Sequence, residues 1–347
     1  MILTDLTLAN FRSYTKRTFA FDKATTLIVG PNTAGKTNIL EAIMLSATGK
    51  SFRADVDAEM VRWGAEVGRA KATTGETKLE VVVTTGSVAG RKTQSKKFFV
   101  NGVARRQVDF IGNLRAVLFW PEHLELITDS PSLRRKYLDG VLVQVDREYR
   151  RTLLSYERGL RQRNRLLDLI NEGKAHHHQL QFWDQLLIKA GGYLTDKRAA
   201  FIDFINTYHM PGVTYRVEYD KSVISESRLK QYVDEEVAAK STLVGPHRDD
   251  FLVTKKDLDV SKYGSRGEQR LAILWLKLAE LAFIERETRE RPLLILDDIF
   301  SELDIEHRTL VLDLLGKQQT IVSSAEEEVV ELLATHKISA KIIRLSV

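Results

Sequence analysis

One eight-residue stretch limits the possible folds of this chain more than any other feature. Residues Gly30 to Thr37 read GPNTAGKT and fit the pattern G-x-x-x-x-G-K-[ST]. The apolar run Thr25 to Val29 precedes this stretch, and the helix-like segment Asn38 to Ala47 follows it. A strand, a glycine-rich loop and a helix in that order are typical of α/β proteins with a buried parallel sheet. We therefore predict an α/β fold built around a phosphate-binding loop.

The residue types in this loop suit the binding of a nucleoside triphosphate. Gly30 and Gly35 let backbone N–H groups converge on phosphate oxygens, and the N-terminus of the following helix adds partial positive charge. Lys36 can reach the β- and γ-phosphates, and the Thr37 hydroxyl can ligate Mg²⁺. We predict ATP and Mg²⁺ as cofactors. The predicted loop comprises Gly30, Pro31, Asn32, Thr33, Ala34, Gly35, Lys36, Thr37 and Asn38.

A second signal is the acidic end of an apolar run, LLILDDIFSELD, from Leu293 to Asp304. A short run of this kind indicates a strand buried on both faces of a sheet. Side chains alternate along a strand, so Asp297 and Asp298 point in different directions. We predict that Asp297 contacts Mg²⁺ and that Asp298 polarises the attacking water.

A third signal is YGSRGEQR, from Tyr263 to Arg270, which precedes an amphipathic helix. Small residues at a helix start leave N–H groups available to an anion. Because the chain already has one phosphate loop, we predict that Ser265, Arg266 and Gly267 cap the γ-phosphate held by a partner subunit. The motif lies one helix and one turn before the acidic strand, as the spacing requires.

The predicted secondary structure changes twice along the chain. Strand patterns at residues 2–8, 25–30, 78–85 and 96–105 mark a mixed first part, with Asn101-Gly102 as a two-residue turn. Residues 133–205 show heptad-like leucines and predict a helical hairpin. Strand patterns return near the end, at QQTIVSS and ISAKIIRL. We predict a head split between residues 1–112 and 245–347, with a mainly helical lobe at 113–244 inserted between its parts.

Bulk properties narrow the function classes. The 347 residues are 43% hydrophobic and 29% charged, which fits a folded chain with a large core. The absence of cysteine excludes disulfides and thiolate metal sites. No apolar run approaches the roughly 20 residues that span a bilayer, so we expect a cytoplasmic protein without a membrane partner. The net charge of +5 permits nucleic acid as a partner without establishing it.

Together these motifs resemble the ABC-type ATPase heads of the SMC and RecF group. Several stretches are similar to the RecF family in particular, in order along nearly the whole chain. They are NFRSY (residues 10–14), GPNTAGKTNILEAI (30–43), FWPEHLELITDSPSLRRKYLD (119–139), GPHRDDF (245–251) and YGSRGEQR (263–270).

The resemblance implies an ABC-type head with a mixed parallel sheet, an antiparallel β subdomain and a helical second lobe. It implies a homodimer that sandwiches two ATP molecules, a weak DNA-stimulated ATPase, and binding to double-stranded or gapped DNA by structure rather than by sequence. It also implies RecO and RecR as partners, RecA loading at gaps, and roles in DNA replication, DNA repair and the SOS response. Arg12 matches an arginine near the nucleotide, and Asp304 an acidic residue after the strand.

Four positions depart from the wider ABC pattern. Many such heads have Gln where this motif has Glu268, and Gln269 follows it here. Asp298 stands where a catalytic Glu is usual, which predicts slow hydrolysis, and Ser323-Ser324-Ala325 stands where a switch His is usual. The glutamine of the Q-loop has no clear equivalent near Phe119 to Glu122.

Two basic clusters are candidates for gripping phosphates, and a solvated surface is an equal alternative for each. One lies on Arg147 to Arg165, and the other includes Lys92, Lys96, Lys97, Arg105 and Arg106. Other functions also stay open: a transporter's ATPase subunit, another SMC-like head, or a small-molecule kinase. The kinase would not need Ser265 to Gly267.

Overall fold

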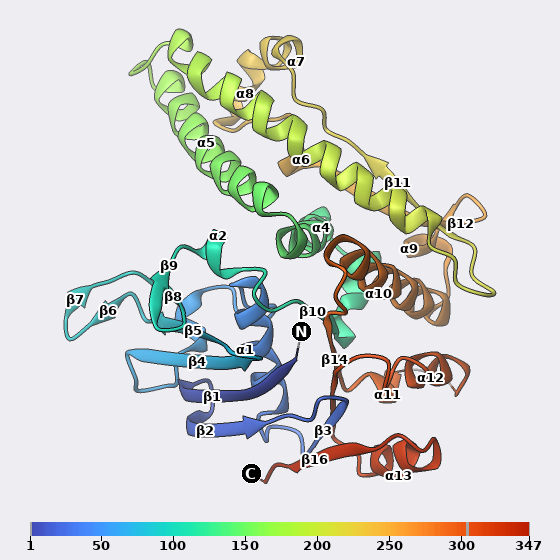
Figure 1. Cartoon of the computed structure of the whole chain (residues 1–347). Coiled ribbons are helices and arrows are strands. Elements are labelled where there is room, and N and C mark those ends of the chain that lie inside the picture. The colour runs from blue at the N-terminus through green and yellow to red at the C-terminus, as the bar shows by residue number, and fades with distance from the viewer. Residues whose placement is uncertain (1, 303–304, 347) are drawn as a thin grey trace. The chain divides into compact units, whose positions relative to one another are not determined.

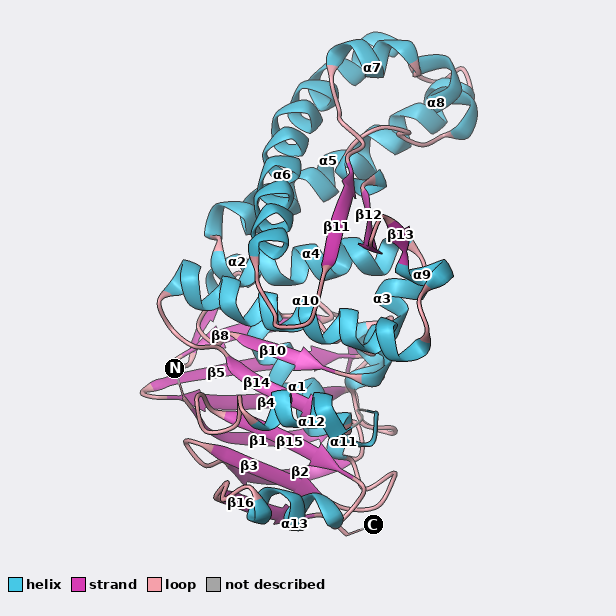
Figure 2. Cartoon of the chain, turned by 90° about the vertical axis from the view of Figure 1, so that its right-hand side faces the viewer, coloured by secondary structure: helices cyan, strands magenta, loops and turns pink. Residues whose placement is uncertain are grey.

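The computed structural model describes residues 2–302 and 305–346, and it divides into two compact units. Unit 1 comprises Met1–His123 and Glu280–Val347, and unit 2 comprises Leu124–Ala279. Figures 1 and 2 show that strands dominate the first unit and helices the second. The phosphate loop and the acidic strand end therefore belong to one unit, although about 260 residues separate them in sequence.

The central sheet of unit 1 is parallel and has the strand order β10-β14-β15-β3-β16. Strands β3, β14 and β15 are buried along their whole length, as their apolar sequences predict. Helix α1 begins directly after the phosphate loop. The elements are β3 (Thr25–Val29), α1 (Lys36–Thr48), β10 (Ala116–Phe119), β14 (Leu293–Asp297), α11 (Ile299–Glu302), α12 (Ile305–Leu312), β15 (Thr320–Ser324), α13 (Glu328–Thr335) and β16 (Ala340–Arg344).

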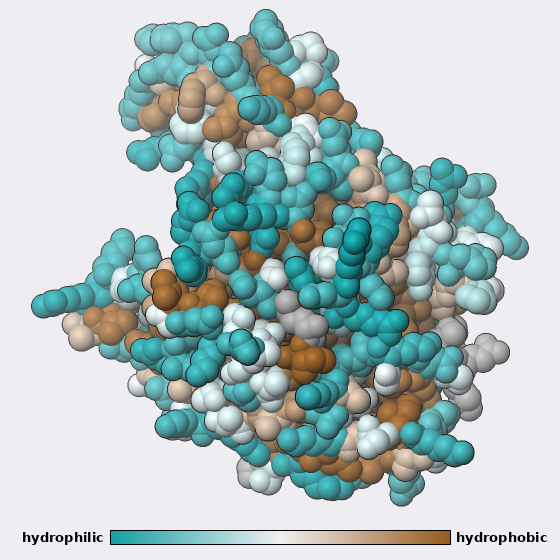
Figure 3. Space-filling view, in the orientation of Figure 1, coloured by the Kyte–Doolittle hydropathy of each residue, from teal (hydrophilic) through white to brown (hydrophobic). Residues whose placement is uncertain are grey.

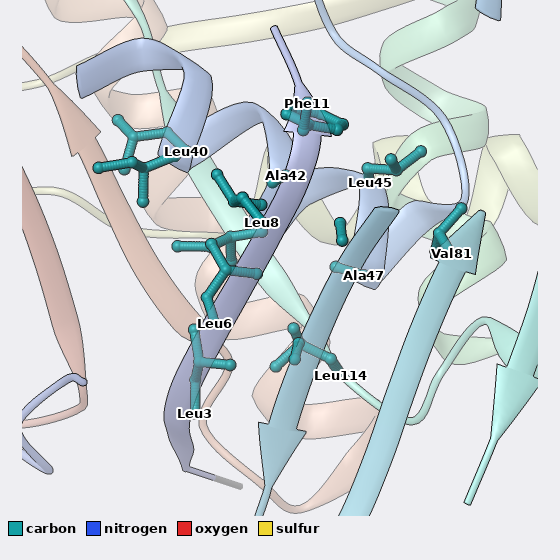
Figure 4. Close-up of a cluster of buried hydrophobic side chains, with 14 of the residues drawn as sticks. Leu3, Leu6, Leu8, Phe11, Leu40, Ala42, Leu45, Ala47, Val81 and Leu114 are labelled. Atoms are coloured by element: carbon teal, nitrogen blue, oxygen red, sulfur yellow. The ribbon is translucent and has the colours of Figure 1, made fainter. Parts of the chain in front are cut away.

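A second sheet in unit 1 is antiparallel, with the order β2-β1-β4-β5-β8-β9. Its inner face and α1 form one apolar core, in which Leu3, Leu6 and Leu8 gather with Leu40 and Leu45 (Figure 4). The elements are β1 (Leu3–Phe11), β2 (Tyr14–Ala20), a 3₁₀ turn (Asp57–Met60), β4 (Val67–Thr74), β5 (Thr77–Thr84), β6 (Ser87–Val88), β7 (Arg91–Lys92), β8 (Lys96–Val100), β9 (Val103–Arg105), α2 (Gln107–Phe110) and a 3₁₀ turn (Pro121–Leu124).

Unit 2 is built on two long antiparallel helices, α5 and α6, which pack side by side (Figure 1). Leu153, Tyr156 and Leu167 of α5 are buried in this packing, as the heptad-like pattern predicts. The elements are α3 (Glu125–Thr128), α4 (Pro131–Val145), α5 (Arg147–Asn171), a 3₁₀ turn (His177–Leu180), α6 (Gln181–Thr207), β11 (Tyr215–Asp220), α7 (Glu226–Gln231), α8 (Val233–Ala239), a 3₁₀ turn (Pro246–Arg248), β12 (Asp250–Lys255), β13 (Leu258–Asp259), α9 (Val260–Tyr263) and the first part of α10 (Arg266–Thr288), whose residues from Glu280 onward belong to unit 1.

The units differ in their limits from the predicted lobes. We expected the second part of the head to begin at residue 245, whereas unit 2 continues to Ala279. The reason is long-range strand pairing: β12 pairs with β11 from Tyr215↔Lys255 to Asp220↔Asp250, which ties residues 250–255 to the helical unit. The predicted hairpin turn at Asn101-Gly102 is confirmed, with positive φ at both residues.

Candidate nucleotide site

Two positions in the phosphate loop exclude any side chain. A Cβ atom on Gly30 would lie 2.7 Å from the carbonyl oxygen of Leu345, which follows β16. Gly35 has φ +92°, in the left-handed region, and a Cβ there would lie 2.8 Å from the Tyr14 hydroxyl oxygen. Glycine is therefore required at both positions by packing as well as by the approach of a phosphate.

Lys36 begins α1 and extends back over the loop. Its Nζ donates hydrogen bonds to the carbonyl oxygens of Gly30, at 2.6 Å, and Pro31, at 3.0 Å. Burial lowers the pKa of Lys36, while the nearby carboxylates of Asp298 and Asp297 act to raise it. The structure thus brings together the cation and the two carboxylates that the sequence predicted as one site.

The two carboxylates at the end of strand β14 lie in different environments. Asp297 is buried and accepts a hydrogen bond from the Ser323 hydroxyl on the neighbouring strand β15. Asp298 has φ +50°, and its N–H donates to the Ser323 carbonyl oxygen at 3.1 Å. Burial raises the pKa of Asp298. Ser323, at the place of the usual switch His, therefore orients Asp297, a role that the sequence did not reveal.

The oxygen donors at this edge of the sheet fit a magnesium ion. Mg²⁺ is usually held by one or two protein oxygens together with substrate phosphates and water. The Thr37 hydroxyl and the Asp297 carboxylate supply such a set, and both lie in unit 1. The described residues contain no cluster of three acidic, His or Cys side chains, so a bound ion would depend on the phosphates for its remaining ligands.

A buried ion pair supports the loop from the side. Arg12 donates from Nε and Nη2 to the two carboxylate oxygens of Glu41, at 2.8 and 2.6 Å. The Glu41 side chain is 0% exposed and also accepts from the Ser51 hydroxyl at 2.6 Å. The hydrogen bonds from Arg12 to Glu41 raise the pKa of Arg12. Arg12 is thereby fixed beside the loop, whereas the sequence had indicated only its nearness to the nucleotide.

An open pocket adjoins the loop in unit 1. Asn38, just after the loop, donates to the Ser13 hydroxyl at 2.9 Å and accepts from Arg53 at 3.2 Å. Trp63, which the sequence reasoning missed, lines this pocket and is 98% exposed. In the sequence, the available signal was a tryptophan between Arg62 and Gly64, outside any apolar run. The lining residues are Arg12, Ser13, Asn38, Arg53, Ala58, Glu59, Val61, Arg62, Trp63, Gly64, Ala65 and Thr85.

The Ser-x-Gly motif stands at the start of α10 in unit 2. The Ser265 hydroxyl accepts from the Glu268 N–H at 3.3 Å, and the Glu268 carboxylate accepts from the Ser265 N–H at 2.9 Å. This reciprocal pair is a capping box, whose S-x-x-E signature can be read directly from the sequence. Lys255 also binds Glu268, at 2.8 Å, and that hydrogen bond lowers the pKa of Glu268 to about 2. Gly267 has open space around it, so a ligand can approach its backbone.

Other predicted residues take simpler positions. Asp304 lies outside the described residues. Trp120, which follows the Q-loop position, packs edge to face on Phe52 at 4.7 Å. The three histidines at 176–178 are exposed around a short 3₁₀ turn. No described helix has both the length and the apolar character needed to span a membrane.

The two basic clusters differ in how their charges are used. In the cluster around the β8–β9 hairpin, Lys96 forms an ion pair with Asp57 at 2.8 Å, and Arg106 forms one with Asp109 at 3.1 Å. On α5, Arg150 and Arg163 are buried and face the interior of unit 2. Only part of each cluster therefore remains available to a ligand.

Comparison with known proteins gives the family of this chain. The model of the RecF/RecN/SMC N-terminal domain matches residues 2–342. A protein of Roseiflexus castenholzii named DNA replication and repair protein RecF is 37% identical, with 93% of both chains covered. The chain belongs to the RecF family. A RecF of Lachnoclostridium phytofermentans is 35% identical over 93% of this chain and 92% of its own length.

Solved structures agree with the RecF assignment. The recombination mediator protein RecF in complex with ATP, from the RecFOR pathway, has a TM-score of 0.85 and 30% identity, with 94% of this chain and 92% of that chain covered. An Smc head domain from Pyrococcus furiosus has a TM-score of 0.51 at 18% identity over 99% of this chain and 93% of its own, which shows the shared fold. The ABC-type ATPase-head fold predicted from the motifs is therefore confirmed, as is the RecF resemblance.

Proposed function

We propose that this RecF-family chain is an ATP-switched DNA-binding protein of recombinational repair and replication. ATP binding drives two copies to dimerise and to bind DNA, and slow hydrolysis, stimulated by DNA, releases both. The observation that carries the proposal is that Lys36, Asp297 and Asp298 meet at one edge of the central sheet in unit 1. The family relation and the ATP-bound neighbour support the same reading.

Each element of the site takes one role in this proposal. The loop residues Gly30–Asn38 hold the phosphates, with Lys36 on the β- and γ-phosphates. Arg12, fixed by Glu41, adds a second cation beside them. Mg²⁺, when bound by Thr37 and Asp297, neutralises phosphate charge. Asp298 orients the attacking water, and its shorter side chain relative to Glu accounts for slow turnover. We also propose that Asp304 contacts the nucleotide.

The pocket beside the loop has the chemistry for the remaining part of ATP. Trp63 offers an exposed aromatic face on which a base can stack, and such stacking contributes about 1–3 kcal/mol. Arg12, Asn38 and Arg53 line the same pocket and supply donors for the sugar and phosphate groups. We place the adenosine moiety in this pocket.

The remaining partners follow from the RecF family. We propose that the start of α10, with Ser265, Arg266 and Gly267, caps the γ-phosphate of ATP bound to the partner subunit. We further propose that the protein acts in the cytoplasm with RecO and RecR, binds duplex or gapped DNA by its structure, and helps to load RecA at gaps during replication and the SOS response. A transporter subunit and a small-molecule kinase lose their support, since the relatives that match over nearly the whole chain are RecF proteins.

Sedimentation velocity and DNA-binding measurements with ATP, with ADP and without nucleotide test this function. We expect a dimer and tight binding to duplex or gapped DNA with ATP, but not with ADP or without nucleotide. The variant Ser265→Arg should bind ATP in its own loop but fail to dimerise and to hydrolyse ATP. Ser227→Arg, which adds the same charge at an exposed serine of unit 2, is the matched control and should behave as wild type. A wild-type protein that stays monomeric with ATP would contradict the proposal.

A further inference from the structure

Helix α5 carries seven arginines, of which two are buried and five are exposed. Arg163 is buried on the inward face with Tyr149 and Tyr156, and Arg150 is buried at the margin of that face. Five other arginines are exposed, and we refer to them as the arginine ridge: Arg147, Arg151, Arg158, Arg161 and Arg165.

The spacing of the ridge makes it a continuous line. Its members are four, seven, three and four residues apart. At about 100° of rotation per residue, all five fall within an arc of about 80° on the helix surface. Arg147 and Arg165 are 18 residues apart, which at 1.5 Å per residue corresponds to about 27 Å. The ridge is therefore a straight row of guanidinium groups on the outer face of one helix.

The support beneath the ridge is rigid. At the helix start, the Asp146 side chain accepts hydrogen bonds from the N–H groups of Glu148 and Tyr149, at 2.8 and 2.9 Å. On the inner face, Arg163 binds Asp184 of α6 at 2.6 Å and contacts Glu236 of α8 at 2.7 Å. These contacts hold the helix from which the exposed arginines project, so the spacing of their backbone positions is set before an extended ligand binds.

Three of the five ridge arginines have no acidic partner among the described residues. Within the described part of the chain, Arg158, Arg161 and Arg165 form no ion pair, and the contact of Arg151 with Glu148 is long, at 3.9 Å. Glu157 is the one acid between Arg151 and Arg165, and it pairs with none of them in the described structure. Ordinary solvated helices interleave both signs of charge at i, i+4 spacing. A row of one sign instead calls for an anionic partner.

We propose that the arginine ridge of α5 binds the phosphate backbone of DNA, an assignment that rests on the proposed function and names its DNA-contact surface. Arginine suits this role because its planar guanidinium binds phosphate oxygens in pairs. A protein interface of this size would be expected to have apolar or aromatic anchors at its centre. The ridge has none; Leu154, partly buried, is the one apolar side chain along it. On the face shown in Figure 3, hydrophilic and hydrophobic side chains are intermixed, so the case for the ridge depends on the charges of its own residues.

The test replaces Arg151, Arg158 and Arg165 together with Gln, which keeps helix propensity and removes three positive charges. The matched control replaces Lys16, Lys23 and Lys78 with Gln, which removes three exposed charges from unit 1 outside both basic clusters. Duplex binding is measured with ATP present between 50 and 200 mM salt. ATP-dependent dimerisation of each variant, by sedimentation, shows that it is folded.

For the ridge variant, we expect the slope of log K against log salt to become shallower by about 2.7, or about 0.9 for each lost phosphate contact. Between 50 and 200 mM salt, the factor by which the affinity of the ridge variant falls should then be roughly 40 times smaller than the factor for wild type. The control variant should keep the wild-type slope. Lys at the three ridge positions should also keep the slope, because a phosphate contact requires charge.

Three results would overturn the assignment. The first is a ridge variant that dimerises with ATP and keeps the wild-type slope. The second is a control variant that loses the slope instead. The third is a ridge variant that keeps DNA binding but loses binding to an acidic partner protein. A wild-type protein that does not bind DNA with ATP would refute the proposed function itself, and is thus distinguishable from a failure of the ridge alone.

Discussion

Replacing the buried Arg163 by Met should destabilise the protein severely although the side chain is far from the phosphate loop in sequence. Arg163 is 1% exposed and joins three segments of unit 2. Its Nε donates to Asp184 at 2.6 Å, and its Nη1 donates to the Thr242 hydroxyl at 2.9 Å. The same Nη1 lies 2.7 Å from Glu236, in an ion pair whose angle falls short of a hydrogen bond.

The cost of this change arises from the carboxylate that remains. The Glu236 side chain is 0% exposed, so without Arg163 it would be a buried charge deprived of its cation. Removing one partner of a buried ion pair typically costs about 3–5 kcal/mol. Met fills most of the volume of the arginine stem, so the loss of packing adds little. We therefore expect Arg163→Met to lower the free energy of unfolding by about 3–5 kcal/mol.

Urea unfolding followed by tryptophan fluorescence measures this loss, because Trp183 lies on α6 next to Asp184. Arg161→Met, two residues away on the arginine ridge, is the control and should change stability by less than about 0.5 kcal/mol. The double variant Arg163→Met/Glu236→Met should recover most of the lost stability, since no charge stays buried without a partner. Equal losses for Arg163→Met and Arg161→Met would refute the reasoning.

Three further outcomes can be measured. Lys36→Ala should weaken ATP binding by about tenfold or more, because it removes a charge-assisted phosphate contact; an unchanged dissociation constant by calorimetry would contradict this. Asp298→Asn should bind ATP with near wild-type affinity but hydrolyse it at least about 100-fold more slowly and hold the dimer; rapid phosphate release would show that another group positions the water. Burial lowers the pKa of His247 to about 4, so the unfolded chain binds a proton that the folded chain does not between about pH 4 and 6.5. Stability should therefore fall as the pH drops through that window, and His247→Gln should flatten this dependence in urea titrations; an unaltered pH profile would argue against it.

The sequence predicted the strands and helices around the nucleotide site better than the side-chain contacts between them. The strand at Thr25–Val29, the acidic strand end and the helical hairpin were all visible, because burial on both faces and heptad-like spacing leave strong local patterns. The contact of Arg12 with Glu41 was not visible, since it joins positions 29 residues apart and no local pattern marks the two as partners. The same holds for Ser323 and Asp297, which meet only because β14 and β15 are neighbours.

The run of arginines on α5 did not show which side chains are buried, because that too depends on contacts with distant parts of the chain. A run of arginines reads alike whether a side chain faces water or a buried carboxylate. The 3.6-residue period of the helix places Arg163 and Arg161 on different faces. The period does not reveal that Arg163 forms an ion pair with Glu236, which lies 73 residues later in the sequence. The pairing of β12 with β11, which ties residues 250–255 to unit 2, likewise cannot be read from local composition.

The strand order of the central sheet also has a consequence for how this chain is made. Strand β3, which carries the phosphate loop, has as its two neighbours β15 and β16, whose residues begin at Thr320 and Ala340. During synthesis at about 5–20 residues per second, the chain must wait about 15–60 s after β3 before β15 leaves the ribosome. Through that interval an apolar strand and its loop lack their permanent partners. A chain interrupted before residue 320 would therefore lack the two strands that flank β3, so the phosphate site can be completed only after residues 320–344 have been made.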